Sequence, residues 1–189
     1  MNSTRENELI AACLRGEWEE FRKIVDIYKA QVMALAMNVL GNREDAEDAC
    51  QDTFIQSYRN LGRFDSQKSF KNWIFTILYR RCLDQLKKRR RFERAFHKAK
   101  HELPCEIRAE MSNPGRRKAL SREMLNRLSP KERIVVTLWA NEGFTAAEIS
   151  EVLHCSASTA RVYLFNARKK IKSLLEKNHD AFKNDGSFI

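Results

Sequence analysis

Apolar side chains recur at three- and four-residue steps along most of this chain, the spacing that aligns them on one face of an α-helix. In residues 5–40 the pattern predicts two helices, the first ending near Gly16 and the second at Gly41-Asn42, because glycine favours a helix stop. Six glycines and three prolines in 189 residues leave little room for the turns of a β fold. The sequence therefore predicts an all-α fold.

The same periodicity continues beyond Asn42, which is a good cap for a third helix running to about Leu61. Residues 62–72 are polar and contain helix-starting signals, so we expect a loop there. A fourth helix is predicted over residues 70–91. The periodicity is then lost over residues 92–118, where two prolines break helical structure, and we interpret this stretch as a flexible linker.

The remaining part of the chain carries its own helix signals. Ser129-Pro130 predicts a helix start, because serine caps helices and proline suits their first position. Thr145 and Glu148 have the spacing of a capping box, which opens a short helix. His154-Cys155 then turns the chain into a last long helix. Two helices joined by such a tight turn have the pattern of a helix-turn-helix.

These elements predict two small helical domains joined by a flexible linker, with the helix-turn-helix in the second domain. The predicted boundaries are 5–91 for the first domain, 92–118 for the linker, 119–175 for the second domain and 176–189 for a C-terminal tail.

Charge is unevenly distributed along the chain, whose formal net charge is +10. Residues 1–60 hold 7 basic and 11 acidic side chains, whereas residues 61–120 hold 17 basic and 6 acidic ones. A basic middle behind an acidic front suggests one surface for phosphates and another for a basic protein partner. A generally basic soluble protein would not need this segregation.

Acidic side chains gather on the outer face of the third predicted helix. Part of this is ordinary helix chemistry, because acidic residues are favoured near a helix N-terminus. The face nevertheless holds no Lys or Arg, although solvated helix faces usually mix signs. We interpret it as a protein-docking face, with a plain solvated face and a metal site as alternatives. Its members are Glu44, Asp45, Glu47, Asp48, Gln51 and Asp52.

Aromatic residues lead directly into a basic run on the fourth predicted helix. This combination suits unpaired DNA bases, which stack on rings while cations bind the phosphates. Aromatic residues at helical spacing are also common in hydrophobic cores, so Trp73 and Tyr79 could serve either purpose. The aromatic residues are Phe64, Phe70, Trp73, Phe75 and Tyr79, and the cations are Arg80, Arg81, Lys87, Lys88, Arg89, Arg90 and Arg91.

The last predicted helix has a basic polar face, which is typical of a helix that enters the major groove of duplex DNA. A helical hairpin without a DNA role is the alternative, since such hairpins are common in all-α proteins. Ser156 or Ser158 caps this helix. Its polar positions include Arg161, Asn166, Arg168, Lys169 and Lys170.

Several kinds of site lack support in the sequence. The five cysteines lie far apart with no Cys-x-x-Cys pair, so we expect reduced thiols rather than zinc or a disulfide framework. We see no signal peptide and no run of 18 or more apolar residues, which predicts a cytoplasmic protein without membrane insertion. We also expect no cofactor, no bound metal and no catalytic residue.

Three stretches resemble segments of bacterial sigma factors, the promoter-specificity subunits of RNA polymerase. Residues 45–54 (DAEDACQDTF) are similar to their polymerase-binding helix. Residues 70–74 (FKNWI), followed by Leu83-Asp84 and the basic run, are similar to their promoter-melting segment. Residues 128–133 (LSPKER) and 147–171 are similar to their fourth conserved region. Two regions in this order, with a short linker, are typical of the extracytoplasmic-function (ECF) class.

The resemblance implies a role for each region. The acidic helix would bind core RNA polymerase, through Asp45, Glu47, Asp48, Gln51, Asp52 and Phe54. The aromatic and basic middle would capture a flipped base of the promoter −10 element, through Phe64, Asp65, Ser66, Lys68, Phe70, Trp73, Arg80, Lys87, Lys88 and Arg89. The last helix would read the −35 element as closed duplex, through Ser156, Ser158, Thr159, Arg161, Tyr163, Asn166 and Arg168. An anti-sigma factor is the expected controlling partner.

Three positions depart from the family's pattern. Arg80 stands where many relatives have Asn, and Tyr163 stands where a basic residue is common, so the preferred promoter sequence stays open. His154 replaces a frequent turn glycine, which leaves the geometry of that turn open.

Two other functions fit parts of the sequence. A stand-alone helix-turn-helix regulator would use the second domain, but it leaves the acidic helix and the aromatic and basic segment unexplained. A metal-dependent nuclease would use Glu44, Asp48 and Asp52, but these carboxylates lie on a single helix without a converging group from a second element.

Overall fold

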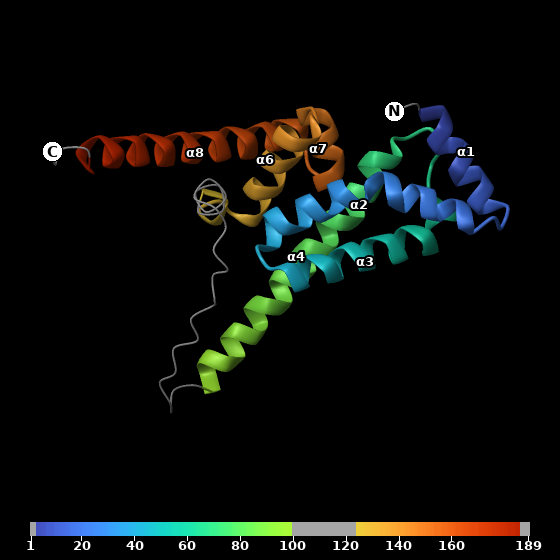
Figure 1. The fold of residues 1–189 in the computed structure, drawn as a ribbon, viewed down its shortest axis with the longest axis horizontal. Coiled ribbons are helices and arrows are strands. Elements are labelled where there is room, and N and C mark those ends of the chain that lie inside the picture. Colours follow the sequence, from blue (N-terminus) through green and yellow to red (C-terminus); the bar gives the residue numbers. More distant parts are fainter. Residues whose placement is uncertain (1–2, 100–123, 186–189) are drawn as a thin grey trace.

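The computed structural model describes residues 3–99 and 124–185, and every regular element within these ranges is helical, which confirms the predicted all-α class (Figure 1). Most of the predicted linker, Cys105 and the start of the second domain near Ala119 lie outside the described residues. The elements are α1 (Ser3–Leu14), α2 (Glu19–Leu40), α3 (Arg43–Arg59), the 3-10 helix η1 (Leu61–Arg63), α4 (Phe70–Ala99), α6 (Pro130–Glu142), α7 (Ala146–Leu153) and α8 (Ala157–Asp185).

The predicted helix ends are confirmed where the sequence offered a cap. Gly41 ends α2 with a φ of 72°, a left-handed conformation that favours glycine. Asn42 caps α3, because its side-chain Oδ1 accepts hydrogen bonds from the backbone N–H groups of Glu44 (2.8 Å) and Asp45 (3.4 Å). Capping boxes open α6 and α7 at the two predicted sites.

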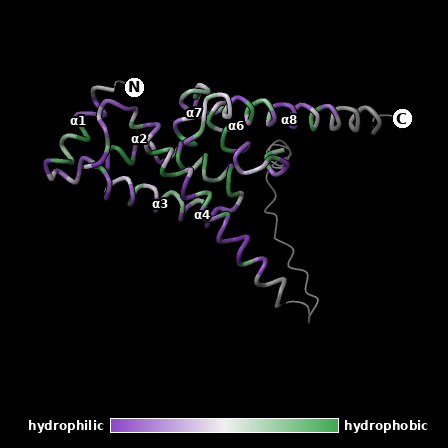
Figure 2. The backbone as a smooth tube through the Cα atoms, turned by 180° about the vertical axis from the view of Figure 1, so that it is seen from behind, coloured by the Kyte–Doolittle hydropathy of each residue, from purple (hydrophilic) through white to green (hydrophobic). Residues whose placement is uncertain are grey.

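The predicted end of the fourth helix at Arg91 is wrong, because α4 continues to Ala99. Its outer half projects from the helical body and is strongly hydrophilic (Figures 1 and 2). The apolar periodicity is lost there because this half leaves the hydrophobic core, whereas the residues remain good helix formers. Arg89 Nε and Glu93 Oε1, one helical turn apart, form an ion pair of 3.1 Å across position 91. In the same way α8 continues to Asp185, beyond the predicted boundary at 175.

The helices form two groups, α1–α4 and α6–α8, which pack against each other. Helix α6 contacts α2, and α7 contacts α4. The rings of Phe75 on α4 and Phe144 before α7 lie edge to face, with centroids 5.5 Å apart. Both residues are almost fully buried in one hydrophobic core that includes side chains of both groups. The tertiary structure therefore joins the two predicted domains in a single body.

Polar contacts border this shared core. The guanidinium of Arg133 on α6 donates a 2.7 Å hydrogen bond from Nη1 to the Val39 carbonyl oxygen in the last turn of α2. This geometry is favourable because carbonyl groups at a helix C-terminus lack partners within the helix and carry partial negative charge. Lys71 Nζ lies 3.3 Å from Glu142 Oε2, at the end of α6.

Among the residues that the structure describes, no helix is both long enough and apolar enough to span a lipid bilayer.

Candidate nucleic-acid and protein interfaces

The acidic face of α3 lies on the side of that helix that points away from the hydrophobic core. Ala46, Ala49 and Thr53 are fully buried beneath it. Asp45 and Phe54, two of the expected polymerase contacts, are only partly exposed, and Phe54 packs against the core. The other expected contacts, Glu47, Asp48, Gln51 and Asp52, are exposed together.

Most of this negative charge has no counter-charge nearby. Arg43 Nε binds Glu47 Oε1 at 2.7 Å, so one carboxylate is paired within the helix. Asp48 and Asp52 have no ion pair or hydrogen bond among the residues that the structure describes. Ile55 follows on the same face and is 37 % exposed, which adds an apolar contact that the sequence interpretation omitted. The face thus offers two unpaired carboxylates beside an apolar side chain.

A cluster of aromatic rings shapes the segment between α3 and α4. Phe70 is only 2 % exposed and packs against Tyr28, Phe64 and Trp73, with ring centroids 5.2–5.7 Å apart. In this arrangement the Phe70 ring therefore offers no face to DNA, although the sequence placed it among the −10 contacts. Phe75 is also buried, and Tyr79 is 7 % exposed. Phe64 and Trp73 stay partly exposed at the edge of the cluster.

The loop before α4 lines an open cavity of about 660 Å³, with α1 and α2 forming the opposite wall. Asp65 holds the loop in a tight turn, because its Oδ1 accepts a 3.0 Å hydrogen bond from the Gln67 backbone N–H. Of the predicted −10 contacts, Ser66, Lys68 and Phe70 line the cavity, whereas Phe64 and Asp65 do not. The polar side chains around this volume can hydrogen-bond a nucleobase.

A second, smaller hollow surrounds Trp73. It measures about 260 Å³ and is lined by Arg63, Arg80 and Arg81, together with Gln56, Asn60, Trp73 and Ile77. Arg81 Nε is buried and has no hydrogen-bond partner among the described residues. Three cations beside an indole ring fit a nucleotide, because the ring can stack a base while the guanidinium groups bind phosphate oxygens.

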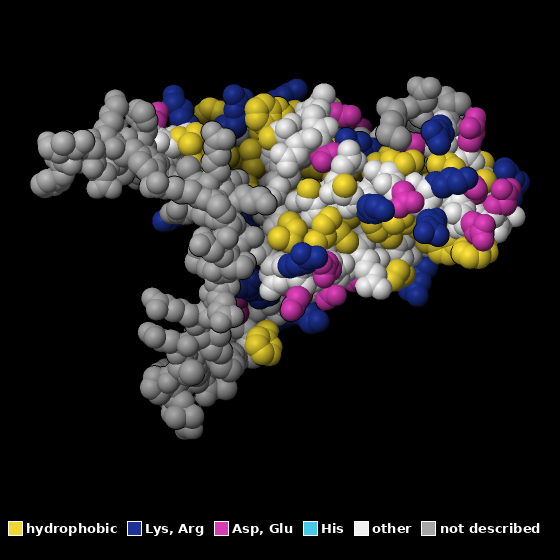
Figure 3. All heavy atoms as spheres, in the orientation of Figure 1, with side chains coloured by type: hydrophobic (Ala, Val, Ile, Leu, Met, Phe, Trp, Pro, Cys, Tyr) yellow, Lys and Arg dark blue, Asp and Glu magenta, His cyan; other side chains and the backbone are white. Residues whose placement is uncertain are grey.

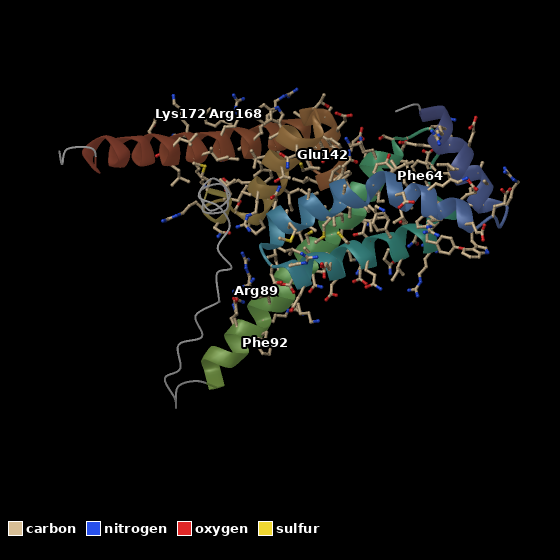
Figure 4. The ribbon with its side chains drawn as sticks, in the orientation of Figure 1. Phe64, Arg89, Phe92, Glu142, Arg168 and Lys172 are labelled. Atoms are coloured by element: carbon tan, nitrogen blue, oxygen red, sulfur yellow. The ribbon has the colours of Figure 1, made fainter. Side chains whose placement is uncertain are left out.

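The basic run occupies the projecting half of α4. Arg89 and Phe92 lie on this half, away from the packed helices (Figure 4). Lys87 pairs with Asp84 at 3.4 Å, and Arg89 pairs with Glu93, so intrahelical acids supply part of the counter-charge that we expected from phosphates. Lys88 is exposed. The surface remains strongly basic after these pairs form.

The helix-turn-helix consists of α7, a turn at His154-Cys155 and α8. His154 adopts a left-handed conformation with φ of 50° and ψ of 51°, which explains why glycine is common at such a position. Ser156 caps α8, because its Oγ accepts a 3.1 Å hydrogen bond from the Thr159 backbone N–H. The Ser158 and Thr159 hydroxyl groups lie 2.7 and 2.8 Å from this same oxygen. All three hydroxyl groups thus have partners within the cap.

The expected −35 contacts fall on two sides of α8. Arg161 and Arg168 are exposed on its outer side, and Figure 4 shows Arg168 and Lys172 pointing away from the other helices. Arg168 also lies over the ring of Trp139, with its Cζ atom 5.0 Å from the ring centroid. Tyr163 is half-buried toward α6, where its hydroxyl accepts a 3.5 Å hydrogen bond from Lys131 Nζ. Asn166 is also partly buried.

The sequence interpretation missed Asn72, Glu151, Val162 and Phe165 at these surfaces, and it missed the contact of Arg80 with His154. Asn72 Nδ2 donates a 2.7 Å hydrogen bond to Glu151 Oε2, and Arg80 Nη2 lies 2.8 Å from His154 Nε2. These contacts join α4 to the helix-turn-helix and have no signature in local sequence. Val162 and Phe165 are exposed on α8, a feature that helical periodicity could have shown.

Carboxylates, histidines and thiols do not converge in this structure. Within residues 3–99 and 124–185 there is no group of three or more His, Cys, Asp or Glu side chains placed to hold a metal ion.

Comparison with known proteins gives two family matches. Residues 24–92 match the model of sigma-70 region 2, and residues 120–171 match that of sigma-70 region 4. Relatives include the ECF RNA polymerase sigma factor SigW of Bacillus subtilis, which is 25 % identical in a match that covers 85 % of this chain and 91 % of SigW. The sigma factor NccH of Alcaligenes xylosoxydans xylosoxydans is 29 % identical, covering 87 % of this chain and 91 % of NccH.

Solved structures have the same fold. CnrH, determined in complex with the cytosolic domain of CnrY, has a TM-score of 0.68 at 24 % identity, covering 89 % of this chain and 96 % of CnrH. RpoE of Bartonella quintana, determined with the anti-sigma factor NepR, has the same TM-score at 23 % identity, covering 84 % and 98 %. The two family matches together span well over half of the chain, in the order of an ECF protein. The chain therefore belongs to the sigma-70 family of RNA polymerase sigma factors and, within it, to the ECF class.

Proposed function

We propose that this protein is a dissociable subunit that directs RNA polymerase to promoters with two recognition elements. The acidic face of α3 binds the polymerase core enzyme. The loop before α4 and α4 itself, including Lys87, Lys88 and Arg89, bind the opened −10 strand, and α8 reads the −35 element as duplex. The proposed regions are 5–91, 119–175 and the segment between them. The polymerase performs the chemistry, so we assign no catalytic residue and no enzymatic activity to this chain.

One observation supports the proposal that the surface around Trp73 binds an unpaired strand and that α8 binds duplex DNA. The hollow beside Trp73 is lined by an aromatic residue and three arginines, whereas the basic surface of α8 is the outer side of a helix that follows a tight turn. A hollow with a ring suits an unpaired base, and a convex basic helix suits the major groove of duplex DNA. A duplex-binding regulator would need only the second surface.

Base capture at the −10 element is the proposed step that opens DNA. Removing a base from the stack costs a few kcal/mol, which a fitted pocket and stacking contacts can offset. The cavity of about 660 Å³ beside the loop at Ser66 and Lys68 is large enough to hold one base. The Trp73 hollow lies on the next part of the same segment and would hold the neighbouring nucleotide.

We also propose control by an anti-sigma factor. The solved structures of CnrH and of Bartonella quintana RpoE are complexes, the former with CnrY and the latter with an anti-sigma factor, and both share this fold. The same proposal places the protein in the bacterial cytoplasm with RNA polymerase, without insertion into a membrane.

The test is run-off transcription with purified core polymerase on a library of genomic promoters, with and without this protein. New start sites that share two short elements at a fixed spacing are the expected result. Tight binding to duplex operators without polymerase, and no new start sites, would instead identify a stand-alone regulator.

Charge reversal on α3 gives a direct prediction for the polymerase contact. Asp48→Arg should weaken binding to core polymerase by about tenfold or more. The substitution replaces an unpaired carboxylate with a cation, which a basic surface of the partner would repel. Fluorescence anisotropy with labelled protein and core polymerase measures this affinity. Glu8→Arg, the same charge change at an exposed position of α1, is the matched control and should leave the affinity unchanged. Equal affinity of the wild type and Asp48→Arg would exclude this face as the docking surface.

A further inference from the structure

The outer side of α8 carries two large apolar side chains that face solvent. Val162 is 56 % exposed and Phe165 is 66 % exposed. They are three residues apart, so they neighbour each other on one helix face. The opposite side of α8 supplies the buried residues, with Ala160 and Ala167 fully buried against α6 and α7. Packing among the residues that the structure describes therefore does not account for the apolar pair.

Cations surround this pair. Arg161, Arg168, Lys169 and Lys172 are exposed on the same helix, and Figure 3 shows basic side chains spaced along the outer side of α8 with hydrophobic ones between them. The first acidic residue on α8 is Glu176, whose Oε1 lies 3.8 Å from Lys172 Nζ. A polyanion with apolar groups on its surface complements such a face. Duplex DNA has both, because thymine presents its methyl group in the major groove between two lines of phosphates.

Few of the polar side chains near Val162 and Phe165 are available to hydrogen-bond a base. The hydroxyl groups of Ser156, Ser158 and Thr159 hydrogen-bond one another at the cap of α8. Arg161, in the second turn, remains as an extended donor on the outer side. An arginine there can bind guanine through two hydrogen bonds, while the neighbouring apolar side chains contact thymine methyl groups.

The spacing of the pair fits adjacent base pairs. Three residues advance about 4.5 Å along a helix axis, and successive base pairs are separated by about 3.4 Å along B-DNA. Val162 and Phe165 are the sixth and ninth residues of α8, within the N-terminal half that recognition helices insert into the major groove.

We infer that Val162 and Phe165 are specificity-determining residues that contact the methyl groups of thymines in the −35 element. This inference rests on the proposed function, because it requires α8 to lie in the major groove of a promoter. It adds to that proposal which residues of α8 contact the bases and which chemical group of the bases they contact.

Replacing thymine by uracil removes only the methyl group and tests the contact directly. The experiment uses holoenzyme reconstituted from core polymerase and the full chain, on a promoter found by the run-off screen. Each thymine of the −35 element is replaced singly by uracil in synthetic promoter DNA. Initiation by the wild type should fall about three- to fivefold at one or two positions, the effect of losing one buried methyl group.

The variants identify the side chain at each methyl group. Val162→Ala and Phe165→Ala should each initiate less from the thymine promoter and no longer respond to uracil at one of the sensitive positions. Leu175→Ala is the matched control, because Leu175 is an exposed apolar residue (48 %) on the same helix, about 15 Å further along its axis. Its uracil response should equal that of the wild type. Thermal melts followed by circular dichroism should be unchanged for all three variants, since each residue is exposed.

The outcomes separate this inference from the function on which it rests. Specific start sites without any uracil effect, or variants that respond to uracil like the wild type, overturn the inference alone. Variants that assemble poorly with core polymerase but keep the wild-type uracil response identify a protein-docking face and also overturn it. Absence of specific start sites with the wild type removes the proposed function, and the inference with it.

Discussion

His154 combines a backbone conformation and a side-chain contact that serve different parts of the molecule. Its left-handed backbone turns the chain between α7 and α8, at a cost of about 1 kcal/mol for a residue with a side chain. Its imidazole lies beside Arg80 of the first helical group. Glycine would make the same turn without strain but could not make this contact. Arg80 and His154, two of the three positions that depart from the family pattern, are therefore in contact with each other.

The cysteine thiols provide a prediction at the same scale. Burial raises the pKa of the Cys82 thiol to about 12 and that of the Cys50 thiol to about 11. The thiolate is the reactive form, so both side chains should react with iodoacetamide at pH 7 far more slowly than a free cysteine. Mass spectrometry after timed labelling measures the rates residue by residue. Labelling in denaturant is the control, and rapid native labelling of Cys82 would contradict the burial described here.

At the scale of elements, Glu132 links the start of α6 to the middle of α8. Its carboxylate accepts a 2.8 Å hydrogen bond from the Ser129 backbone N–H, which completes the capping box, and it binds Lys170 Nζ at 2.8 Å. Burial alone would raise the pKa of this carboxyl group. The hydrogen bonds from Lys170 and Ser129 outweigh burial, and the pKa lies below its usual range.

Neutralising this carboxylate should destabilise the second helical group. Glu132→Gln should lower the free energy of unfolding at pH 7 by about 1–3 kcal/mol, because it removes a buried charge-assisted hydrogen bond. The depressed pKa means that the carboxylate stabilises the fold above its ordinary pKa of about 4.3, and that this contribution is lost as the pH falls through the lower pKa of the folded state. The difference between wild type and variant should therefore shrink below about pH 4.

Urea unfolding at pH 7 and at lower pH measures both effects. Glu176→Gln is the matched control, because it removes an exposed ion pair with Lys172 on the same helix and should change stability by less than about 0.5 kcal/mol. A difference for Glu132→Gln that stays constant with pH would show that packing, rather than charge, is responsible.

At the scale of the whole molecule, the two helical groups hold each other through residues of the proposed DNA-binding segment. Asn72 and Arg80 on α4 contact Glu151 and His154 of the helix-turn-helix. A DNA strand that binds Arg80 through Nη2 would compete with His154 for that atom. On the outer side of α8, Arg168 and Lys172 point away from the other helices (Figure 4). In this arrangement the surface proposed to read duplex is exposed, while part of the surface proposed to bind the opened strand contacts the other helical group.

Breaking the polar contact should separate the groups. Glu151→Arg removes the acceptor of the Asn72 hydrogen bond and places a larger, cationic side chain against α4, so the radius of gyration measured by X-ray scattering should increase. Helix content by circular dichroism should stay constant. Glu176→Arg, the same charge change near the exposed end of α8, is the control and should keep the wild-type radius. An unchanged radius for Glu151→Arg would show that the apolar contact of Phe75 with Phe144 suffices.

The sequence by itself determined the elements and the chemistry of their surfaces. Apolar periodicity and caps at Asn42, Ser129 and Thr145 place the helices, because these signals act within a few residues of the chain. The same local signals indicated the helix-turn-helix, and together with the order of the motifs they indicated the sigma-factor family. Local signals failed at the end of α4, where helix propensity persists after the apolar pattern stops.

Only the tertiary structure decided which side chains share a surface. The aromatic pattern could not distinguish Phe70, which is buried, from Trp73, which borders a hollow with three arginines, because both positions are apolar at helical spacing. The contacts of Asn72 with Glu151 and of Arg80 with His154 join residues more than 70 positions apart. Such pairings depend on how the helix groups pack through their shared hydrophobic core, and the periodicity of one segment holds no information about its partner in that packing.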